Sequence, residues 1–90
     1  MNYHVTYSKH AFKQLQKMDK FDARLITSWI RKNLEGCADP RIHGKALAGN
    51  LGDLWRYRVG NYRILATISD TQITIHIAEI GHRKNIYTRK

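Results

Sequence analysis

Hydrophobic residues near the start of the chain recur at helical spacing. A single apolar stripe, whose members lie three to four residues apart, predicts an amphipathic helix. Its members are Ala11, Phe12, Leu15 and Met18. Ser8 lies just before the stripe and is a residue type that caps helix N-termini, so we expect the helix to begin after it. Before Ser8, residues 3–7 alternate between apolar and polar, which indicates a strand.

A second helix is expected directly after the first. Asp19 can serve as its N-cap, and Gly36 stands where a helix typically stops. Between them the apolar positions again follow the helical period: Phe21, Leu25, Ile26, Trp29, Ile30 and Leu34. The sixteen residues Gly36–Leu51, which include Asp39-Pro40 and three glycines, then resemble a linker. A structureless loop of that length is uncommon in a small domain, which favours a functional role for it.

The second half of the chain predicts three strands rich in aromatic and β-branched residues: Leu54–Val59, Tyr62–Ser69 and Gln72–Ile80. The element order is therefore β-α-α-β-β-β. We predict an α+β fold in which the two N-terminal helices pack on one face of a small, mainly antiparallel β-sheet. With 90 residues, we expect one domain over positions 1–90, because a second hydrophobic core would need roughly another 50 residues.

The dipeptide Gly60-Asn61 separates the first two of these strands and is typical of a two-residue hairpin turn of type II′. Closing this turn pairs Val59 with Tyr62, Arg58 with Arg63, Tyr57 with Ile64, and Arg56 with Leu65. A second turn, centred on Asp70-Thr71, would pair Ile68 with Ile73 and Leu65 with His76. Because side chains alternate along a strand, these pairings assign every strand residue to one of two faces.

One face is apolar and is expected to pack under the helices: Trp55, Tyr57, Val59, Tyr62, Ile64, Ala66, Ile68, Ile73, Ile75 and Ile77. The other, which we call the arginine face, holds Leu54, Arg56, Arg58, Arg63, Leu65, Thr67, Thr74, His76, Ala78 and Ile80. Arg58 lies across from Arg63, where like charges destabilise a sheet, and no acid shares the face in this register. Either the arginines form a solvated surface, or an external polyanion binds them over a partly dry floor of Leu65 and Ile80.

The charge balance favours the polyanion. The chain has 16 Lys and Arg against 7 Asp and Glu, and this net charge of +9 makes nucleic acid or an acidic protein the expected partner. The part after Pro40 carries +6, and six of its nine bases are arginine, which suits bidentate phosphate contacts. The lone Cys37 and the lack of a signal peptide or long apolar run predict a cytoplasmic protein that does not span a membrane.

Two segments strongly resemble the RelE/ParE superfamily of bacterial and archaeal toxins. They are residues 54–64, Leu-Trp-Arg-Tyr-Arg-Val-Gly-Asn-Tyr-Arg-Ile, and residues 81–87, Gly-His-Arg-Lys-Asn-Ile-Tyr. The stretch 44–49 is similar to the family's Lys-Leu-x-Gly, with one residue inserted between Lys45 and Leu47. The resemblance covers essentially the whole chain. It implies a RelE-like toxin of a type II toxin–antitoxin system, with a cognate antitoxin protein that binds it in a hetero-oligomeric complex.

Within the superfamily, RelE-like members cleave mRNA in the ribosomal A site, and ParE-like members poison DNA gyrase. The resemblance implies that the RelE-like catalytic positions fall on Arg56, Arg58, Arg63, Arg83 and Tyr87. Because ParE-like proteins generally lack this full set, the resemblance favours a ribosome-dependent mRNA endonuclease. A ParE-like inhibitor of gyrase and a basic module that merely binds nucleic acid remain the alternatives.

The chemistry of metal-free RNA cleavage fits these residue types. The 2′-hydroxyl attacks the adjacent phosphate, so the site needs fixed cations for the phosphorane, here Arg56, Arg58 and Arg63. RelE itself has lysines where this chain has Arg56 and Arg58, and an arginine cannot release a proton. Proton transfer therefore falls to Tyr87 or to His82, which by parity continues the arginine face.

Most of the remaining histidines and aromatic residues are expected to have structural rather than catalytic roles. His76 shares the arginine face but lies mid-strand, and three histidines are expected to be structural: His4, His10 and His43. Three aromatic residues are expected in the core: Trp29, Trp55 and Tyr57. Tyr87 is then the aromatic residue expected to contact RNA. Further RNA contacts are expected from Lys45, Lys84, Arg89 and Lys90. The sequence has no metal-ligand spacing and no glycine-rich phosphate loop, so no cofactor is expected.

Overall fold

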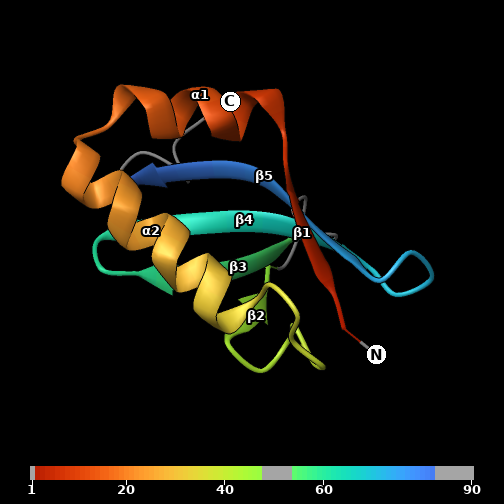
Figure 1. Ribbon diagram of the computed structural model, residues 1–90. Helices are drawn as coiled ribbons and strands as arrows, with labels where there is room; N and C mark the ends of the chain where they lie inside the picture. The colour runs from red at the N-terminus through yellow and green to blue at the C-terminus, as the bar shows by residue number, and fades with distance from the viewer. Residues whose placement is uncertain (1, 48–53, 83–90) are drawn as a thin grey trace.

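The structure is a computed structural model that describes residues 2–47 and 54–82. Its elements, in chain order, are β1 (His4–Tyr7), α1 (Lys9–Lys17), α2 (Lys20–Asn33), β2 (Gly44–Ala46), β3 (Trp55–Val59), β4 (Tyr62–Ser69) and β5 (Thr74–His82). The strands form one sheet in the order β1-β5-β4-β3-β2, with β1 parallel to β5 and the other neighbours antiparallel. Both helices cover the same face of the sheet (Figure 1). The predicted α+β architecture is confirmed, and β2 is an additional strand inside the segment that resembled a linker.

The helix boundaries follow the predicted caps. The Ser8 hydroxyl accepts a hydrogen bond from the Ala11 N–H at 2.9 Å, and it donates one to the Ala78 carbonyl at 2.8 Å. The Asp19 carboxylate accepts the Phe21 N–H at 2.9 Å, so it caps α2. Gly36 follows α2 with a φ of +78°, the left-handed conformation that commonly ends a helix. Ser8 therefore ties α1 to β5 as well as capping it.

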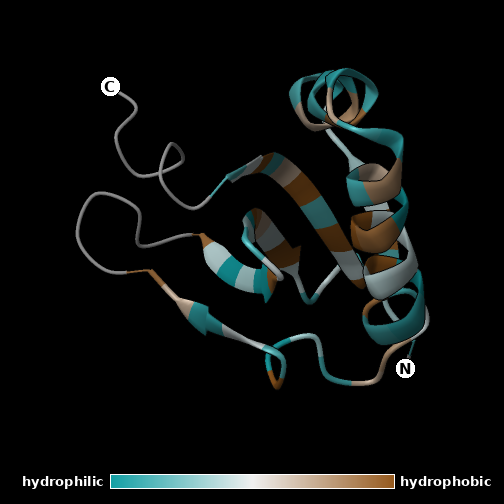
Figure 2. Ribbon diagram, turned by 90° about the vertical axis from the view of Figure 1, so that its left-hand side faces the viewer, coloured by the Kyte–Doolittle hydropathy of each residue, from teal (hydrophilic) through white to brown (hydrophobic). Residues whose placement is uncertain are grey.

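The core lies between the helices and the sheet, as the apolar face predicted. Figure 2 shows hydrophobic positions of α2 turned toward the strands. The largest fully buried side chains include Tyr57, Ile26, Ile30, Leu34, Ile64, Ile75 and Ile77. The Tyr57 hydroxyl donates to the Pro40 carbonyl at 2.6 Å, and burial raises the pKa of this tyrosine. Trp29 and Trp55 are partly buried and pack against this core, so the core assignment of all three aromatic residues is confirmed.

The register of the β3–β4 hairpin is the predicted one. All four expected pairs are present, from Val59 with Tyr62 to Arg56 with Leu65, and the register continues to Trp55 with Ala66. Gly60 has a φ of +59°, as the first turn position requires. Arg58 and Arg63 are consequently direct cross-strand neighbours.

The predicted β4–β5 register is wrong. Ile68 pairs with Ile75 rather than with Ile73, because the turn spans residues 70–73 and Ile73 lies within it at a φ of +52°. The register also shifts between Leu65 and Ala66, where β5 contains one extra residue, Ala78. A bulge of one residue reverses the side-chain parity that follows it.

The bulge changes the face of every later β5 residue. Ile80 pairs with Ile64 and is 1% exposed in the core, so the assignment of Ile80 to the arginine face is wrong. Glu79 pairs with Leu65 and takes that place instead. No helix in the described part of the chain combines the length and the apolar character needed to cross a membrane.

Candidate functional site

The sheet face opposite the helices gathers cations from three consecutive strands. Lys45 of β2 pairs with Arg56 of β3, and Arg56 pairs with Leu65 of β4. Because directly paired residues project to the same side, these side chains form one row across the sheet. Arg58 and Arg63 form the adjacent row. The structure thus brings together four of the predicted site residues, Lys45 included, whose placement depends on the unpredicted strand β2.

Arg63 is the unusual member of this cluster because it is buried. Its side chain is 5% exposed, whereas Arg58 across from it is exposed. Among the described residues, Nε and Nη1 of Arg63 find no hydrogen-bond partner. Buried donors without partners are costly in free energy, and a bound anion is the group that would satisfy them. This pair of arginines is therefore suited to hold a phosphate.

The floor beneath the cations is partly dry, and it also includes an acid. Leu65 is 4% exposed and pairs directly with Arg56, which confirms its predicted place on this face. The expectation that no acid shares the arginine face is wrong, since Glu79 lies on the far side of Leu65 from Arg56. A low-dielectric floor strengthens the attraction between an arginine and an anion.

A pocket opens where β2 meets this face. It has a volume of about 320 Å³ and is lined by Ile42, His43, Gly44, Lys45, Arg56 and Arg58. The His43 ring meets the Trp29 ring edge-on, with centroids 6.1 Å apart and planes at 79°. Sequence reasoning placed His43 among the structural histidines and did not foresee this pocket. The available signal was the length of the segment Gly36–Leu51, which favoured a functional role.

An ion pair anchors the chain segment that leads into this pocket. The Arg41 guanidinium donates two hydrogen bonds of 3.1 Å to the Asp70 carboxylate, one to each oxygen. The Tyr3 hydroxyl donates to the same carboxylate at 2.6 Å. The Arg41 hydrogen bonds, followed by that of Tyr3, lower the pKa of Asp70. The Arg41 Cζ also lies 5.9 Å from the centroid of the Trp55 ring, so the segment before β2 is joined both to the β4–β5 turn and to the start of β3.

The histidines are divided between the two faces. His76 lies on the arginine face as predicted, where its Nδ1 is 2.8 Å from the Thr6 hydroxyl. The parity expectation for His82 is wrong, because the Ala78 bulge turns His82 to the helix side opposite Tyr62. The two rings meet edge-on at 5.6 Å. Arg83, Lys84, Tyr87, Arg89 and Lys90 lie outside the described residues, so their predicted roles stay predictions.

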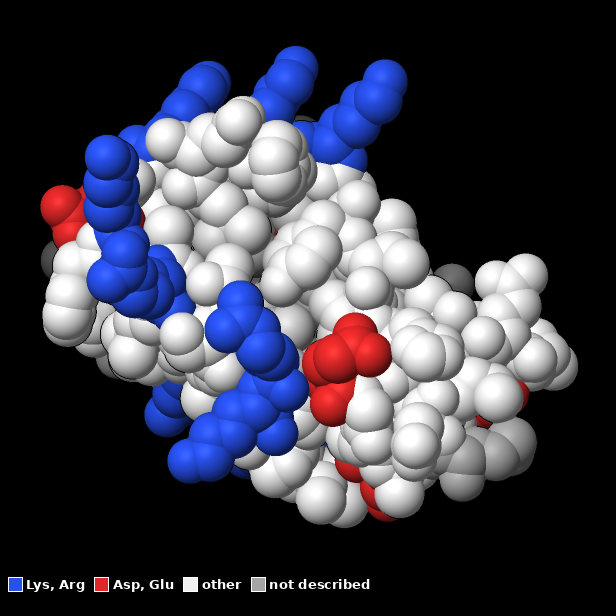
Figure 3. All heavy atoms as spheres, viewed as in Figure 1, with Lys and Arg blue, Asp and Glu red and all other residues white. Residues whose placement is uncertain are grey.

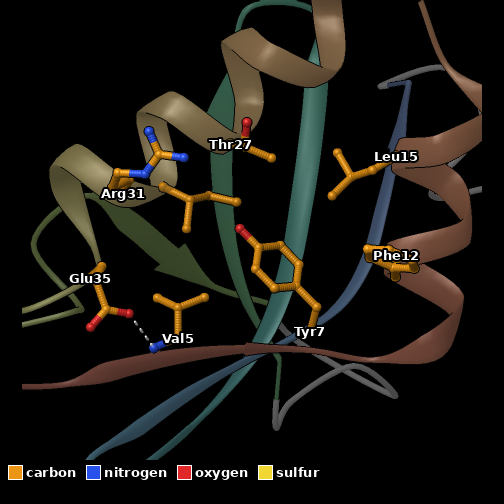
Figure 4. Close-up of a pocket in the computed structure, with 8 residues that line it drawn as sticks. Val5, Tyr7, Phe12, Leu15, Thr27, Arg31 and Glu35 are labelled. Carbon is orange, nitrogen blue, oxygen red and sulfur yellow. Dashed lines mark hydrogen bonds between the residues drawn. The ribbon is translucent and has the colours of Figure 1, made fainter. Parts of the chain in front are cut away.

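The helix side carries a second pocket of a different character. It has a volume of about 340 Å³ and is lined by Val5, Tyr7, Phe12, Leu15, Thr27, Ile30, Arg31 and Glu35 (Figure 4). The Tyr7 hydroxyl points into the pocket, and burial raises the pKa of Tyr7. Glu35 is bound to the Val5 N–H at 2.9 Å, which lowers the pKa of Glu35. Lysine and arginine side chains also gather over the outer sides of the helices (Figure 3). This pocket is mainly apolar and lacks the convergent arginines of the opposite face.

Within 2–47 and 54–82, no three His, Cys, Asp or Glu residues come together in a group that could hold a metal ion. Burial raises the pKa of Cys37, which keeps its thiol protonated and poorly reactive. The charged side chains that the described site does bring together are those of Lys45, Arg56, Arg58 and Arg63, with Glu79 on the same face.

Comparisons with known proteins agree with the resemblance found in the sequence. The family model described as the ParE toxin of type II toxin–antitoxin system, parDE, matches residues 5–87. A RelE-like toxin protein of Escherichia coli is 30% identical over 87 residues, which cover 93% of this chain and 86% of that protein. Toxin RelG of Mycobacterium tuberculosis is 29% identical over 89 residues, which cover 99% of this chain and 100% of that protein.

The fold matches those of solved structures. In the crystal structure of the toxin–antitoxin complex RelBE2 from Mycobacterium tuberculosis, one chain superposes with a TM-score of 0.84 at 26% identity. The match covers 94% of this chain and 95% of that one. Over this span the two chains share the same overall fold.

Proposed function

The chain belongs to the RelE/ParE toxin family of type II toxin–antitoxin systems, and from this premise we propose that it is a ribosome-dependent endoribonuclease. Its substrate would be mRNA in the ribosomal A site, and cleavage would inhibit translation. The observation that carries the proposal is the Arg58–Arg63 pair, in which buried Arg63 donors without partners lie beside an exposed second arginine. Fixed, partly desolvated cations stabilise the charge that develops on a phosphorane.

The proposed reaction needs no metal ion. The 2′-oxygen of a ribose attacks the adjacent phosphorus while its proton passes to a base, and a 2′,3′-cyclic phosphate forms. The bond to the 5′-oxygen of the next nucleotide breaks, and that oxygen takes up a proton. Arg56, Arg58 and Arg63 would hold the non-bridging oxygens, and arginine suits this task because it remains charged throughout.

Proton transfer is assigned to residues at the C-terminal end. Tyr87 is our proposed base, with Arg83 as a further phosphate contact, because these positions match the family motif Gly81-His82-Arg83-Lys84-Asn85-Ile86-Tyr87. His82 is the second choice. Its position opposite Tyr62, on the helix side of the sheet, argues against direct contact with a phosphate held on the arginine face.

The second proposed partner is a cognate antitoxin. Structures of similar chains include toxin–antitoxin complexes, such as RelBE2 of Mycobacterium tuberculosis. A net charge of +9 suits an acidic segment that folds on binding, and we propose that its carboxylates contact some of Arg56, Arg58, Arg63 and Arg83. Such contacts would cover the site and inhibit the toxin in a hetero-oligomeric complex.

Toeprinting of mRNA in a translating extract tests the proposed activity. Addition of the purified protein is expected to produce cuts at A-site codons, and omission of ribosomes is expected to abolish them. Efficient cleavage of free mRNA would contradict ribosome dependence, and an intact message on stalled ribosomes would contradict cleavage altogether.

Inhibition of DNA gyrase is the second candidate function, because the matching family model is described as a ParE toxin. A supercoiling assay with purified gyrase distinguishes the two. The endonuclease proposal expects supercoiling to proceed at normal rate, whereas a gyrase inhibitor would stall it and leave mRNA intact.

A further inference from the structure

The pocket beside β2 combines cations with an aliphatic side chain and an imidazole ring. Its lining includes three cations, Lys45, Arg56 and Arg58, and also the side chains of Ile42 and His43. Ile42 is 69% exposed, which is unusual for a large aliphatic side chain next to three cations. No carboxylate is among the described residues that line this pocket. A ligand that combines negative charge with a flat ring system matches these groups.

We infer that this pocket is a nucleobase subsite, which holds the base of a nucleotide next to the phosphate bound by the arginines. Single-stranded RNA offers this combination in every residue, since a base that can stack follows each phosphate. A volume of about 320 Å³ lies at the small end of the range for ligand pockets and fits one nucleotide unit rather than a longer segment. The inference rests on the proposed function and adds a specificity-determining contact to it.

Local packing fixes the pocket before any ligand arrives. The His43 ring is held at 79° to the Trp29 ring, and Trp29 in turn packs against the buried Tyr57 at 5.8 Å. Gly44 allows β2 to approach β3 closely, because a Cβ there would lie 2.3 Å from the Arg56 carbonyl oxygen and 2.7 Å from Trp55 Nε1. Such preorganisation lowers the entropic cost of binding a base.

The same features argue against an acidic peptide as the main occupant. Carboxylates would pair with the cations, but they would leave the His43 ring and the exposed Ile42 side chain without a matching group. A base stacked on these two side chains covers them while its own phosphate reaches Arg56 or Arg58. Binding of an antitoxin segment in this pocket is the competing outcome of the test.

The test compares a short single-stranded RNA with the same RNA in abasic form, both made non-cleavable by 2′-O-methylation, in equilibrium binding without ribosomes. The wild-type protein is expected to bind the intact RNA about tenfold more tightly, the range expected for one stacked base. Ile42→Ala and His43→Ala should lose most of this difference while their affinity for abasic RNA stays within about twofold. His43→Phe keeps a planar ring and should retain the difference.

Matched controls are available on the helix side. Phe21→Ala removes a side chain that is 74% exposed at the start of α2, and His10→Ala removes an exposed histidine of α1. Both should behave as wild type. The inference is overturned if the wild type binds both RNAs equally, or if the pocket variants weaken both alike. It is also overturned if these variants weaken antitoxin binding alone.

This experiment is independent of cleavage. If the wild type bound intact and abasic RNA equally but still cut mRNA at A-site codons, the base subsite would be contradicted and the endonuclease proposal would stand. If the wild type bound intact RNA more tightly than abasic RNA but made no cuts on ribosomes, the endonuclease proposal would be contradicted and the base subsite would stand.

Discussion

Arg58 and Arg63 lie directly opposite each other on β3 and β4, and while Arg58 is exposed, Arg63 is 5% exposed. Two like charges in a cross-strand pair destabilise a sheet, and burial of one of them adds a desolvation cost. Folding alone gives no reason for this arrangement. An anion bound between the two guanidinium groups would relieve both costs, which is why we take the pair as the centre of the proposed phosphate site.

Replacement of Arg63 should lower the cleavage activity without lowering the stability of the fold. Arg63→Ala removes the cross-strand repulsion and the unpaired buried donors, so thermal unfolding is expected at the wild-type temperature or slightly above it. Cleavage on ribosomes should fall by about 100-fold or more, because a preorganised donor to the phosphorane is lost. Single-turnover cleavage and a thermal melt of the same sample measure the two effects.

Two further variants test whether charge or packing is responsible. Arg63→Met keeps a long apolar stem in the buried position and should lose as much cleavage as Arg63→Ala. Arg24→Ala removes an exposed arginine of α2 and should leave both properties unchanged. Full toxicity of Arg63→Ala would place the phosphate elsewhere on the molecule.

Antitoxin binding should depend on salt. If carboxylates of the antitoxin contact the arginine face, the dissociation constant should rise steadily between 50 and 500 mM salt, because screening shortens the reach of charge pairs to about 10 Å at 0.1 M and about 3 Å at 1 M. Arg56→Ala should flatten this dependence more than Lys13→Ala on α1. An affinity that is constant over the salt range would mean that apolar contacts carry the complex.

The sequence predicted the fold wherever the signal was local. The caps at Ser8 and Asp19 and the turn at Gly60-Asn61 depend on residues adjacent in the chain, and all three predictions are confirmed. The β4–β5 register failed because it depends on a turn that includes Ile73 and on the bulge at Ala78. One extra residue reverses the alternation of side chains along the strand, and no local sequence pattern predicted the bulge.

The site, like the fold, was predictable only where it depends on local signals. Arg56, Arg58 and Arg63 share a face because their parity derives from the correctly predicted hairpin. The placement of His82 and Ile80 failed because both follow the bulge. The His43 pocket and the Arg41–Asp70 ion pair join segments far apart in sequence, and the hydrophobic pattern of the chain carries no information on such contacts.

Loss of the Ser8 hydroxyl should destabilise the fold more than loss of an ordinary cap. Ser8→Ala removes the acceptor for the Ala11 N–H and leaves the Ala78 carbonyl at the bulge without its partner. A cost of about 1–2 kcal/mol is expected, which lowers the melting temperature by roughly 5–15 °C in a domain of this size. Asp19→Ala, which removes an exposed cap, should cost less, and Ser8→Thr should restore most of the loss. Equal effects of Ser8→Ala and Asp19→Ala would contradict a role of Ser8 beyond capping.

The Asp70 cluster should give the protein a pH-dependent contribution to stability. Hydrogen bonds from Arg41 and Tyr3 lower the pKa of Asp70 from its usual 3.8 in the folded state. The stabilisation is therefore complete above the unfolded-state pKa and is lost as the pH falls through the lower, folded-state pKa. Asp70→Asn should lower the melting temperature at pH 7, and the difference from wild type should shrink below about pH 4. A difference that is constant from pH 7 to pH 3 would show that ionisation of Asp70 plays no part.

The last prediction concerns the group that accepts the 2′-hydroxyl proton. An unperturbed tyrosine titrates near pH 10, and we expect the arginines close to Tyr87 in the sequence to favour its phenolate, which would suit Tyr87 as the base. Tyr87→Phe keeps the ring and removes the hydroxyl, and it should lower single-turnover cleavage on ribosomes by at least about tenfold. His82→Gln should cost less, since His82 packs edge-on against Tyr62 on the opposite side of the sheet from Arg56 and Arg58. A smaller loss in Tyr87→Phe would leave Tyr87 as a stacking surface alone. The reverse order would assign the proton transfer to His82, and the end of β5 would then have to turn this histidine toward the arginine face when mRNA binds.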